Sequence, residues 1–316
     1  MAKGNKSSQL STYPRRTGGY LAADSLFPKP EQPLSDDKLK QAIRRAFQRS
    51  LKNKKGETVQ LPQTPQELVA SCLQHLRERG DPALSPSFYC QVPVEEVFEL
   101  DAIPYEMHRH RMLIGKFYQF LLIELMRSRF PHVLDGKNEG DAEAEIYPPG
   151  LDLGLRLFIS VKKSADTVGG QDFGGMINRL ENMARADKNL TTPYLNVICV
   201  ATPQRGSIEP YDEARHMRMT EGKPYSPNTE VWMPGFIFPY LTGLDPNVIY
   251  DKAREMIREY LPFYTLEHRA ECSNLLADEL RSLGLVNDGT GRLDPDLFAQ
   301  YISQPKSIKR KMRPTS

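Results

Sequence analysis

The sequence predicts an α/β protein whose core is a mixed β-sheet flanked by helices, with further helices toward both ends. Three observations indicate this class: a strongly helical, largely apolar stretch at 107–130, two alternating segments at 140–146 and 155–163, and a buried strand at 194–202 that follows a further helix. The order of helices and strands is not a regular βαβ alternation, so we do not expect a Rossmann domain.

Two helices are expected before this core, which begins at about residue 107. Residues 1–35 mix Gly, Ser, Pro and Lys with little periodicity and are typical of a flexible arm. In the basic segment that follows Ser35, apolar residues recur every four positions, which favours an amphipathic helix. A second helix is predicted from Thr64 to about Arg79, with proline at its first position and glycine beyond its end.

Further elements are expected after the core segments. The apolar segment 231–241 is interpreted as a strand whose aromatic residues lie in the core, and 247–261 as a helix. Residues 264–300 suggest a small helical appendage. We therefore predict four parts: a basic N-terminal arm with its helix, a helical segment, a catalytic core, and the appendage with a basic tail. Their boundaries are 1–60, 61–106, 107–262 and 263–316.

Composition and charge indicate a folded protein with two basic ends. The chain has 316 residues, of which 39% are hydrophobic and 26% charged, so most of it should fold. It has no apolar run long enough for a membrane span, no signal peptide and no paired cysteines, which favours a cytoplasmic protein with reduced thiols. Residues 1–55 hold 13 Lys and Arg against four Asp and Glu, and the last eleven residues hold five against none. These basic ends are interpreted either as arms that bind a polyanion or as solvated tails with no partner.

The two alternating segments carry the candidate chemistry. They are expected to be antiparallel neighbours joined by the turn-forming residues YPPGLDLG. A register centred in that turn pairs Asp141 with Lys162 and Glu143 with Ser160. Side chains two apart on a strand share a face, and opposed Cβ atoms lie about 5 Å apart, so these four residues would form one polar cluster. The residues expected to face the core on the other side are Leu157, Ile159 and Val161.

Two carboxylates and a lysine in one cluster suit metal-assisted hydrolysis of a phosphodiester. Carboxylate oxygens bind Mg²⁺, which polarises the phosphate and lowers the pKa of a bound water. An ammonium group orients that water or stabilises charge on the phosphorane. The alternative is a surface hairpin whose charges pair across the strands.

The long helix, the acidic strand, the strand ending in Lys162, the next helix and the buried strand together resemble the PD-(D/E)XK nuclease core. The stretch ISVKKSADTVGGQDFGG also resembles type II restriction endonucleases. The resemblance covers roughly residues 107–245. It implies a restriction-endonuclease-like sheet and a Mg²⁺-dependent, site-specific double-stranded DNA endonuclease. It also implies metal binding by Asp141 and Glu143, with Lys162 acting on the water and Ser160 orienting the groups.

This sequence departs from the family pattern at two positions. Gly140, not proline, precedes Asp141, and Ser160 stands where the family has an acid. Glu143 is our preferred replacement for that acid, because the expected register places it opposite Ser160. The alternatives are Glu181 as a migrated acid, Gln119 as a supporting group, Asp152 as the first acid, and Lys163 as the active lysine.

For DNA contacts we expect Lys163, Gln171, Gln204 and Arg205, the last two at the end of a buried strand. A palindromic target calls for a homodimer. The resemblance further implies a bacterial cytoplasmic restriction system with a cognate DNA methyltransferase. Two alternative functions remain: an inactive DNA-binding protein with a nuclease-like core, and a DNA repair or mobile-element nuclease.

Overall fold

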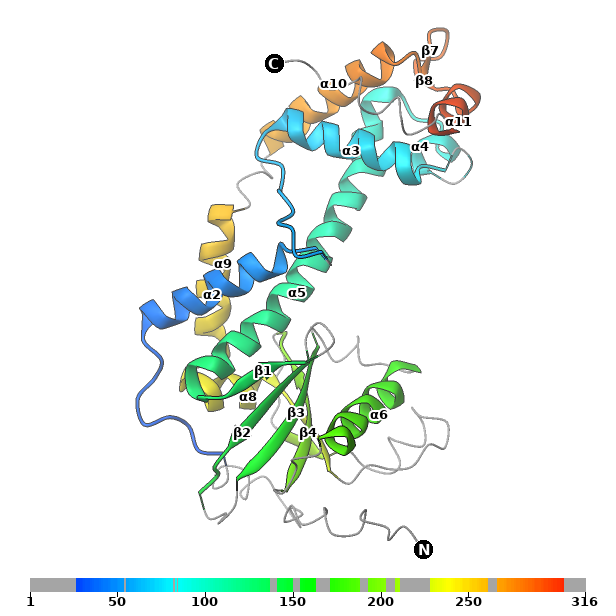
Figure 1. Cartoon of the computed structure of the whole chain (residues 1–316). Helices are drawn as coiled ribbons and strands as arrows, with labels where there is room; N and C mark the ends of the chain where they lie inside the picture. Colours follow the sequence, from blue (N-terminus) through cyan, green and yellow to red (C-terminus); the bar gives the residue numbers. More distant parts are fainter. Residues whose placement is uncertain are drawn as a thin grey trace, which may run out of the picture. The chain divides into compact units, whose positions relative to one another are not determined.

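A computed structural model of the chain shows two compact units, which are described separately (Figure 1). Unit 1 comprises residues 1–58 and 113–257, and unit 2 comprises residues 59–112 and 258–316. Among the helices of the described residues, none is both long and apolar enough to cross a membrane. The residues that the structure describes are 27–53, 55–81, 83, 85–136, 141–149, 154–162, 171–187, 193–202, 208–210, 228–260 and 266–303.

Unit 1 is built on a six-stranded mixed sheet in the order β1-β2-β3-β4-β6-β5. The first three strands form an antiparallel meander, β4 and β6 run parallel to β3, and β5 is antiparallel to β6. The predicted α/β class, with a mixed sheet, is therefore confirmed. The short strands β1 and β5 were not predicted, because three residues are too few to show a period. The strands are β1 (Val133–Asp135), β2 (Asp141–Ile146), β3 (Leu155–Lys162), β4 (Tyr194–Val200), β5 (Ile208–Pro210) and β6 (Thr229–Trp232).

Helices cover both faces of this sheet. One face packs against α6, where Met176, Ile177 and Leu180 form a core with Phe158 of β3 and Ile198 of β4. Figure 1 shows α6 on one side of the sheet and α2 and α9 on the other. The residues predicted to face the core on that other side are all buried: Leu157, Ile159 and Val161. The helices of unit 1 are α2 (Asp36–Ser50), the part of α5 (Ile103–Arg129) from residue 113, α6 (Gln171–Ala186), α8 (Pro234–Thr242) and most of α9 (Pro246–Tyr260).

The strand predicted at 231–241 is wrong over most of its length. The chain leaves β6 at Trp232, and α8 begins at Pro234, the first helical position, where a proline loses no hydrogen bond. Nearly every side chain of α8 is buried, as predicted for its aromatic residues, so the segment shows no polar face that would reveal a helical period. Trp232 is also buried, and its indole nitrogen donates to Glu230 at 2.8 Å.

Unit 2 is mainly helical and has its own hydrophobic core. Helices α3 and α10 contribute Leu68, Cys72, Leu276 and Leu280 to this core, and α11 contributes Phe298. All four cysteines of the chain are free, which agrees with the predicted absence of a disulfide framework. The elements of unit 2 are α3 (Pro65–Arg79), α4 (Pro86–Tyr89), η2 (Val94–Glu96), η3 (Phe98–Ala102), the start of α5, α10 (Leu266–Ser282), β7 (Val286–Asn287), β8 (Arg292–Leu293) and α11 (Pro295–Ser303).

The N-terminus of α3 gives a first testable expectation. Thr64, the first residue of the predicted helix, is its N-cap, and its hydroxyl accepts a hydrogen bond from the backbone N–H of Glu67 at 3.2 Å. Replacing Thr64 with alanine should therefore lower the free energy of unfolding by about 1 kcal/mol, because one helix N–H loses its acceptor. Urea denaturation of the full chain measures this, and Thr64→Ser, which keeps the hydroxyl, should be nearly neutral. An equal loss in both variants would rule out the capping role.

Candidate functional site

The predicted site lies between the sheet and α6, at the start of β2. Asp141, the first residue of β2, lies directly opposite Ser160 of β3, and both side chains are buried. Arg179 of α6 joins them: its Nη2 donates to Asp141 Oδ1 at 3.0 Å and to Ser160 Oγ at 3.1 Å, and its Nε lies 2.9 Å from Asp141 Oδ2. The centre of the site is thus a carboxylate, a hydroxyl and a guanidinium in mutual contact.

The predicted register of the hairpin is wrong by two residues. Asp141 pairs with Ser160 instead of Lys162, and Glu143 pairs with Phe158 instead of Ser160. A shift of two residues leaves every side chain on the same face, so the alternating pattern cannot distinguish the two registers. The side-chain contacts accompany the observed register, because Arg179 binds Asp141 and Ser160 together and Arg156 pairs with Glu143.

The new register separates the predicted cluster of four. Glu143 accepts a hydrogen bond from Arg156 of β3 at 2.9 Å, next to Phe158 and away from Ser160. Lys162 lies two residues beyond Ser160 on the same face of β3, in the opposite direction along the strand. At about 3.3 Å per residue, the strand positions of Glu143 and Lys162 differ by roughly 13 Å. Only Asp141 and Ser160 are brought into direct opposition, with Lys162 next along the strand.

Two of the alternative site residues, Glu181 and Gln119, lie in the described part of the chain. Glu181 of α6 accepts hydrogen bonds from two residues of β4, the Tyr194 hydroxyl at 3.0 Å and Asn196 Nδ2 at 2.7 Å. Its carboxylate therefore binds side chains of β4 and does not take the place of the acid missing at Ser160. Burial raises the pKa of Tyr194 above its ordinary value, which keeps this hydroxyl protonated. Gln119 of α5 donates to the backbone oxygen of Val161 at 3.2 Å, between Ser160 and Lys162, and so supports the strand at the site.

Several predicted residues lie outside the described part of the chain. The backbone of Gln171 begins α6, but its side chain is not among those described. The others are Asp152, Lys163, Gln204 and Arg205. Their predicted roles, DNA contact above all, stay predictions.

Arg179 is a site residue that the sequence analysis missed. It falls three residues after Met176 and one before Leu180, both of which face the sheet, so it stands on the apolar side of α6. A charged residue on the apolar side of a buried helix needs a partner of opposite charge, and the acids of the neighbouring strands were the available partners. The helical spacing was therefore a usable signal.

Asp141 and Ser160 are of the residue types that could bind the Mg²⁺ that the family resemblance implies. Mg²⁺ in proteins commonly uses one or two carboxylates and completes its shell with water and substrate phosphate. Asp141 supplies a carboxylate and Ser160 a hydroxyl oxygen at one place, which fits that chemistry. Glu143 would have to leave Arg156 to join them. Among the described residues, no group of three or more His, Cys, Asp and Glu side chains is placed to bind a metal ion. A metal would thus depend on Asp141.

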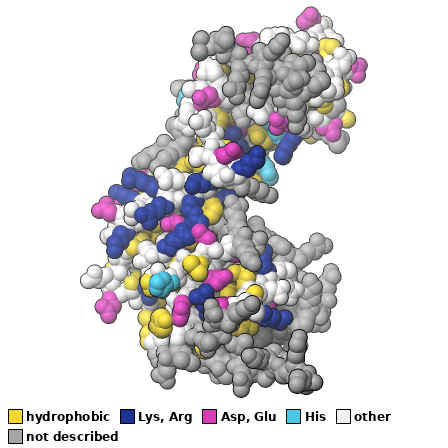
Figure 2. Space-filling model, viewed as in Figure 1, with side chains coloured by type: hydrophobic (Ala, Val, Ile, Leu, Met, Phe, Trp, Pro, Cys, Tyr) yellow, Lys and Arg dark blue, Asp and Glu magenta, His cyan; other side chains and the backbone are white. Residues whose placement is uncertain are grey.

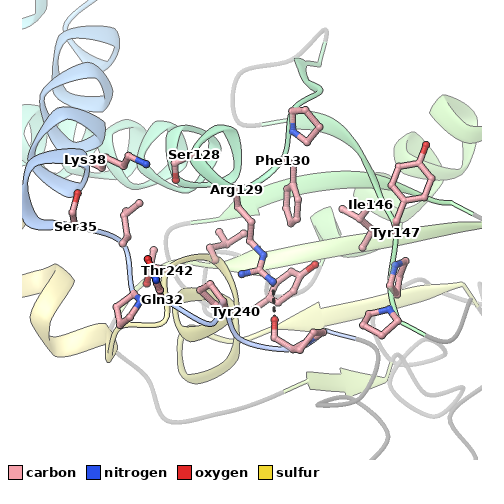
Figure 3. Close-up of a pocket in the computed structure, with 18 of the residues that line it drawn as sticks. Gln32, Ser35, Lys38, Ser128, Arg129, Phe130, Ile146, Tyr147, Tyr240 and Thr242 are labelled. Atoms are coloured by element: carbon pink, nitrogen blue, oxygen red, sulfur yellow. Dashed lines mark hydrogen bonds between the residues drawn. The ribbon is translucent and has the colours of Figure 1, made fainter.

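A separate pocket of about 650 Å³ lies in unit 1 at the other end of β2 (Figure 3). It is lined by segments 28–38 and 145–149 together with the ends of α5 and α8. Figure 3 shows Arg129 at its centre, where the guanidinium lies 4.7 Å from the centroid of the Tyr240 ring and donates to the Pro28 carbonyl at 2.7 Å. The pocket contains none of the predicted site residues, so it is distinct from the site at Asp141.

No protein-family model and no curated protein matches the sequence of this chain. The fold itself therefore defines the class: a mixed α/β protein whose sheet is flanked by helices. Asp141 and Ser160 are buried on the face of the sheet that α6 covers, where the half-buried Arg179 contacts both.

Proposed function

We propose that the protein is a Mg²⁺-dependent, site-specific double-stranded DNA endonuclease of the type II restriction class, with a variant PD-(D/E)XK site. The observation that carries the proposal is the opposition of Asp141 and Ser160 on β2 and β3, with Lys162 two residues further on the same face. The order of α5, the antiparallel meander, α6 and the parallel strand β4 supports it, because the resemblance implies this succession.

In this proposal each residue of the site has a defined role. Asp141 and Glu143 would hold the cation through their carboxylates, which in this structure pair with Arg179 and Arg156. A bound Mg²⁺ would polarise the phosphate and lower the pKa of a bound water. The Lys162 ammonium orients the attacking water and offsets negative charge on the phosphate in the transition state. Arg179 fixes the orientation of Asp141 and Ser160 through its hydrogen bonds to both.

The proposed partners follow from the reaction. Cutting both strands of a palindrome requires two sites related by a two-fold axis, so the active form is a homodimer. Restriction in a bacterial cytoplasm requires a DNA methyltransferase of the same specificity, which protects the host genome. The proposed DNA contacts are Lys163, Gln171, Gln204 and Arg205.

The direct test compares two acids of one strand face. Asp141→Asn should abolish Mg²⁺-dependent fragmentation of a phage genome, with a rate at least ~10²-fold below wild type, because the amide removes the charge that holds the cation. Glu145→Gln is the matched control, since Glu145 lies on the same face of β2, four residues away. This variant should cleave DNA at the wild-type rate. Discrete fragments in Mg²⁺, and none after chelation with EDTA, establish the activity.

Two outcomes would contradict the proposal. If Asp141→Asn still produces discrete fragments, Asp141 is not part of the active site. If wild-type protein leaves the genome intact in Mg²⁺ and in Mn²⁺ at all salt concentrations, the protein is not an endonuclease. Thermal unfolding of both variants shows whether a lost activity reflects a lost fold, because Asp141 is buried and ion-paired.

The ion pair between Asp141 and Arg179 favours a second candidate function, a DNA-binding protein with an inactive nuclease-like core. The guanidinium already neutralises the carboxylate, and a serine stands where the family has its other acid. This candidate predicts salt-sensitive retention of DNA on a gel and no cleavage with any divalent metal. The genome digest described above therefore separates the two functions.

A further inference from the structure

Helix α2 has one buried and one exposed face, and the exposed face is basic. Its buried residues include Leu39, Ile43 and Phe47, which recur every four positions, as the sequence predicts. The opposite face carries exposed cationic side chains. We call Lys38, Arg44, Arg45 and Lys52 the α2 basic face; the last of them lies just beyond the end of the helix.

The four cations of the α2 basic face have no acidic partner among the described residues, although acids are available nearby. Asp36 instead pairs with Lys40 at 2.7 Å and with Lys252 at 3.6 Å, and Arg49 pairs with Glu124 on the buried side. Asp36 and Asp37 are both exposed acids of the first turn, and Asp36 pairs with lysines outside the α2 basic face. Cations that the protein leaves unpaired on one surface create a positive potential that attracts a polyanion.

Two exposed glutamines lie between these cations. Gln41 and Gln48 are seven residues apart, which is about 10.5 Å along a helix, and both point away from the buried face. Amide groups donate to phosphate oxygens and to base edges, which completes the set of groups that DNA-binding surfaces use. Figure 2 shows Lys and Arg side chains gathered over the region that Figure 1 labels α2.

We propose that the α2 basic face is a contact surface for the phosphate backbone of double-stranded DNA. The choice of DNA as the polyanion rests on the proposed function, whereas the contact itself involves no cleavage. Lys38 and Arg45 are also seven residues apart, so their charges are spaced by about 10.5 Å along the helix, close to the ~12 Å width of the major groove that phosphates border.

The test is the salt dependence of binding to a duplex, measured in EDTA so that cleavage plays no part. The variant Lys38→Gln, Arg44→Gln, Arg45→Gln, Lys52→Gln should bind at least ~10-fold more weakly at 50 mM salt. The slope of log affinity against log salt should fall by about 3 to 4, since each lost phosphate contact removes about 0.9. Exchanging the four residues between lysine and arginine, which keeps the charges, should preserve the slope.

A charge-matched control separates a surface from a net-charge effect. Lys29, Arg79, Arg254 and Arg292 are exposed and lie outside α2, and replacing all four with glutamine removes the same charge. Equal losses in the two quadruple variants, or an unchanged slope in the α2 variant, would overturn the proposal. So would a preference of the wild-type α2 face for RNA or for phosphatidylserine vesicles over duplex DNA. Binding that depends on α2 in a protein that never cuts would support this surface and reject the nuclease.

Discussion

Replacing Lys162 with alanine is expected to lower the rate of Mg²⁺-dependent DNA cleavage by about 10²- to 10⁴-fold, the range typical for loss of a group that transfers a proton or stabilises charge in the transition state. Lys162 is the last residue of β3 and lies on the same face as Ser160, two positions further along the strand. Because one of several cationic groups is removed, the affinity for duplex DNA in EDTA should change by less than ~10-fold. The measurement is the initial rate of plasmid linearisation at saturating protein.

Two further variants sharpen this prediction. Lys162→Arg keeps a charge that does not deprotonate, so partial activity would indicate charge stabilisation, whereas complete loss would indicate proton transfer. Lys29→Ala, an exposed lysine away from β3, should cut at the wild-type rate. If Lys162→Ala cleaves as fast as this control, Lys162 has no part in the reaction, and Lys163 becomes the candidate lysine.

Replacing Glu124 with alanine is expected to destabilise unit 1 by about 2–4 kcal/mol. The Glu124 side chain is 5% exposed, and its Oε1 accepts hydrogen bonds from Arg49 at 2.8 Å and from Arg127 at 2.6 Å. Removing one member of a buried ion pair usually costs about 3–5 kcal/mol, because the remaining charge stays partly desolvated. Both arginines retain access to water, which reduces the expected cost. Urea denaturation gives the change in the free energy of unfolding.

Asp135 provides the matched control for this effect. It binds the same two arginines, at 2.9 Å from Arg49 and 2.8 Å from Arg127, but its side chain is 49% exposed. Asp135→Ala should therefore cost less than about 1 kcal/mol, as exposed ion pairs do. Equal costs for the two variants would show that burial of the carboxylate does not determine the strength of this network.

Much of the architecture was predictable because it depends on local patterns. The helices α2 and α3 and the strands β2, β3 and β4 were found within a few residues of their observed bounds, since their apolar residues repeat with the period of their own secondary structure. Helix α8 was mistaken for a strand because a segment that is buried all round shows no period.

The candidate site divides in the same way. The sequence alone determined that Asp141, Ser160 and Lys162 would share one face of neighbouring strands, because alternation assigns faces. Only the tertiary structure decided which residues oppose each other, since registers two residues apart leave every side chain on the same face. It also decided that Arg179, 19 residues after Ser160, would reach Asp141, because helix packing joins positions that no local period relates.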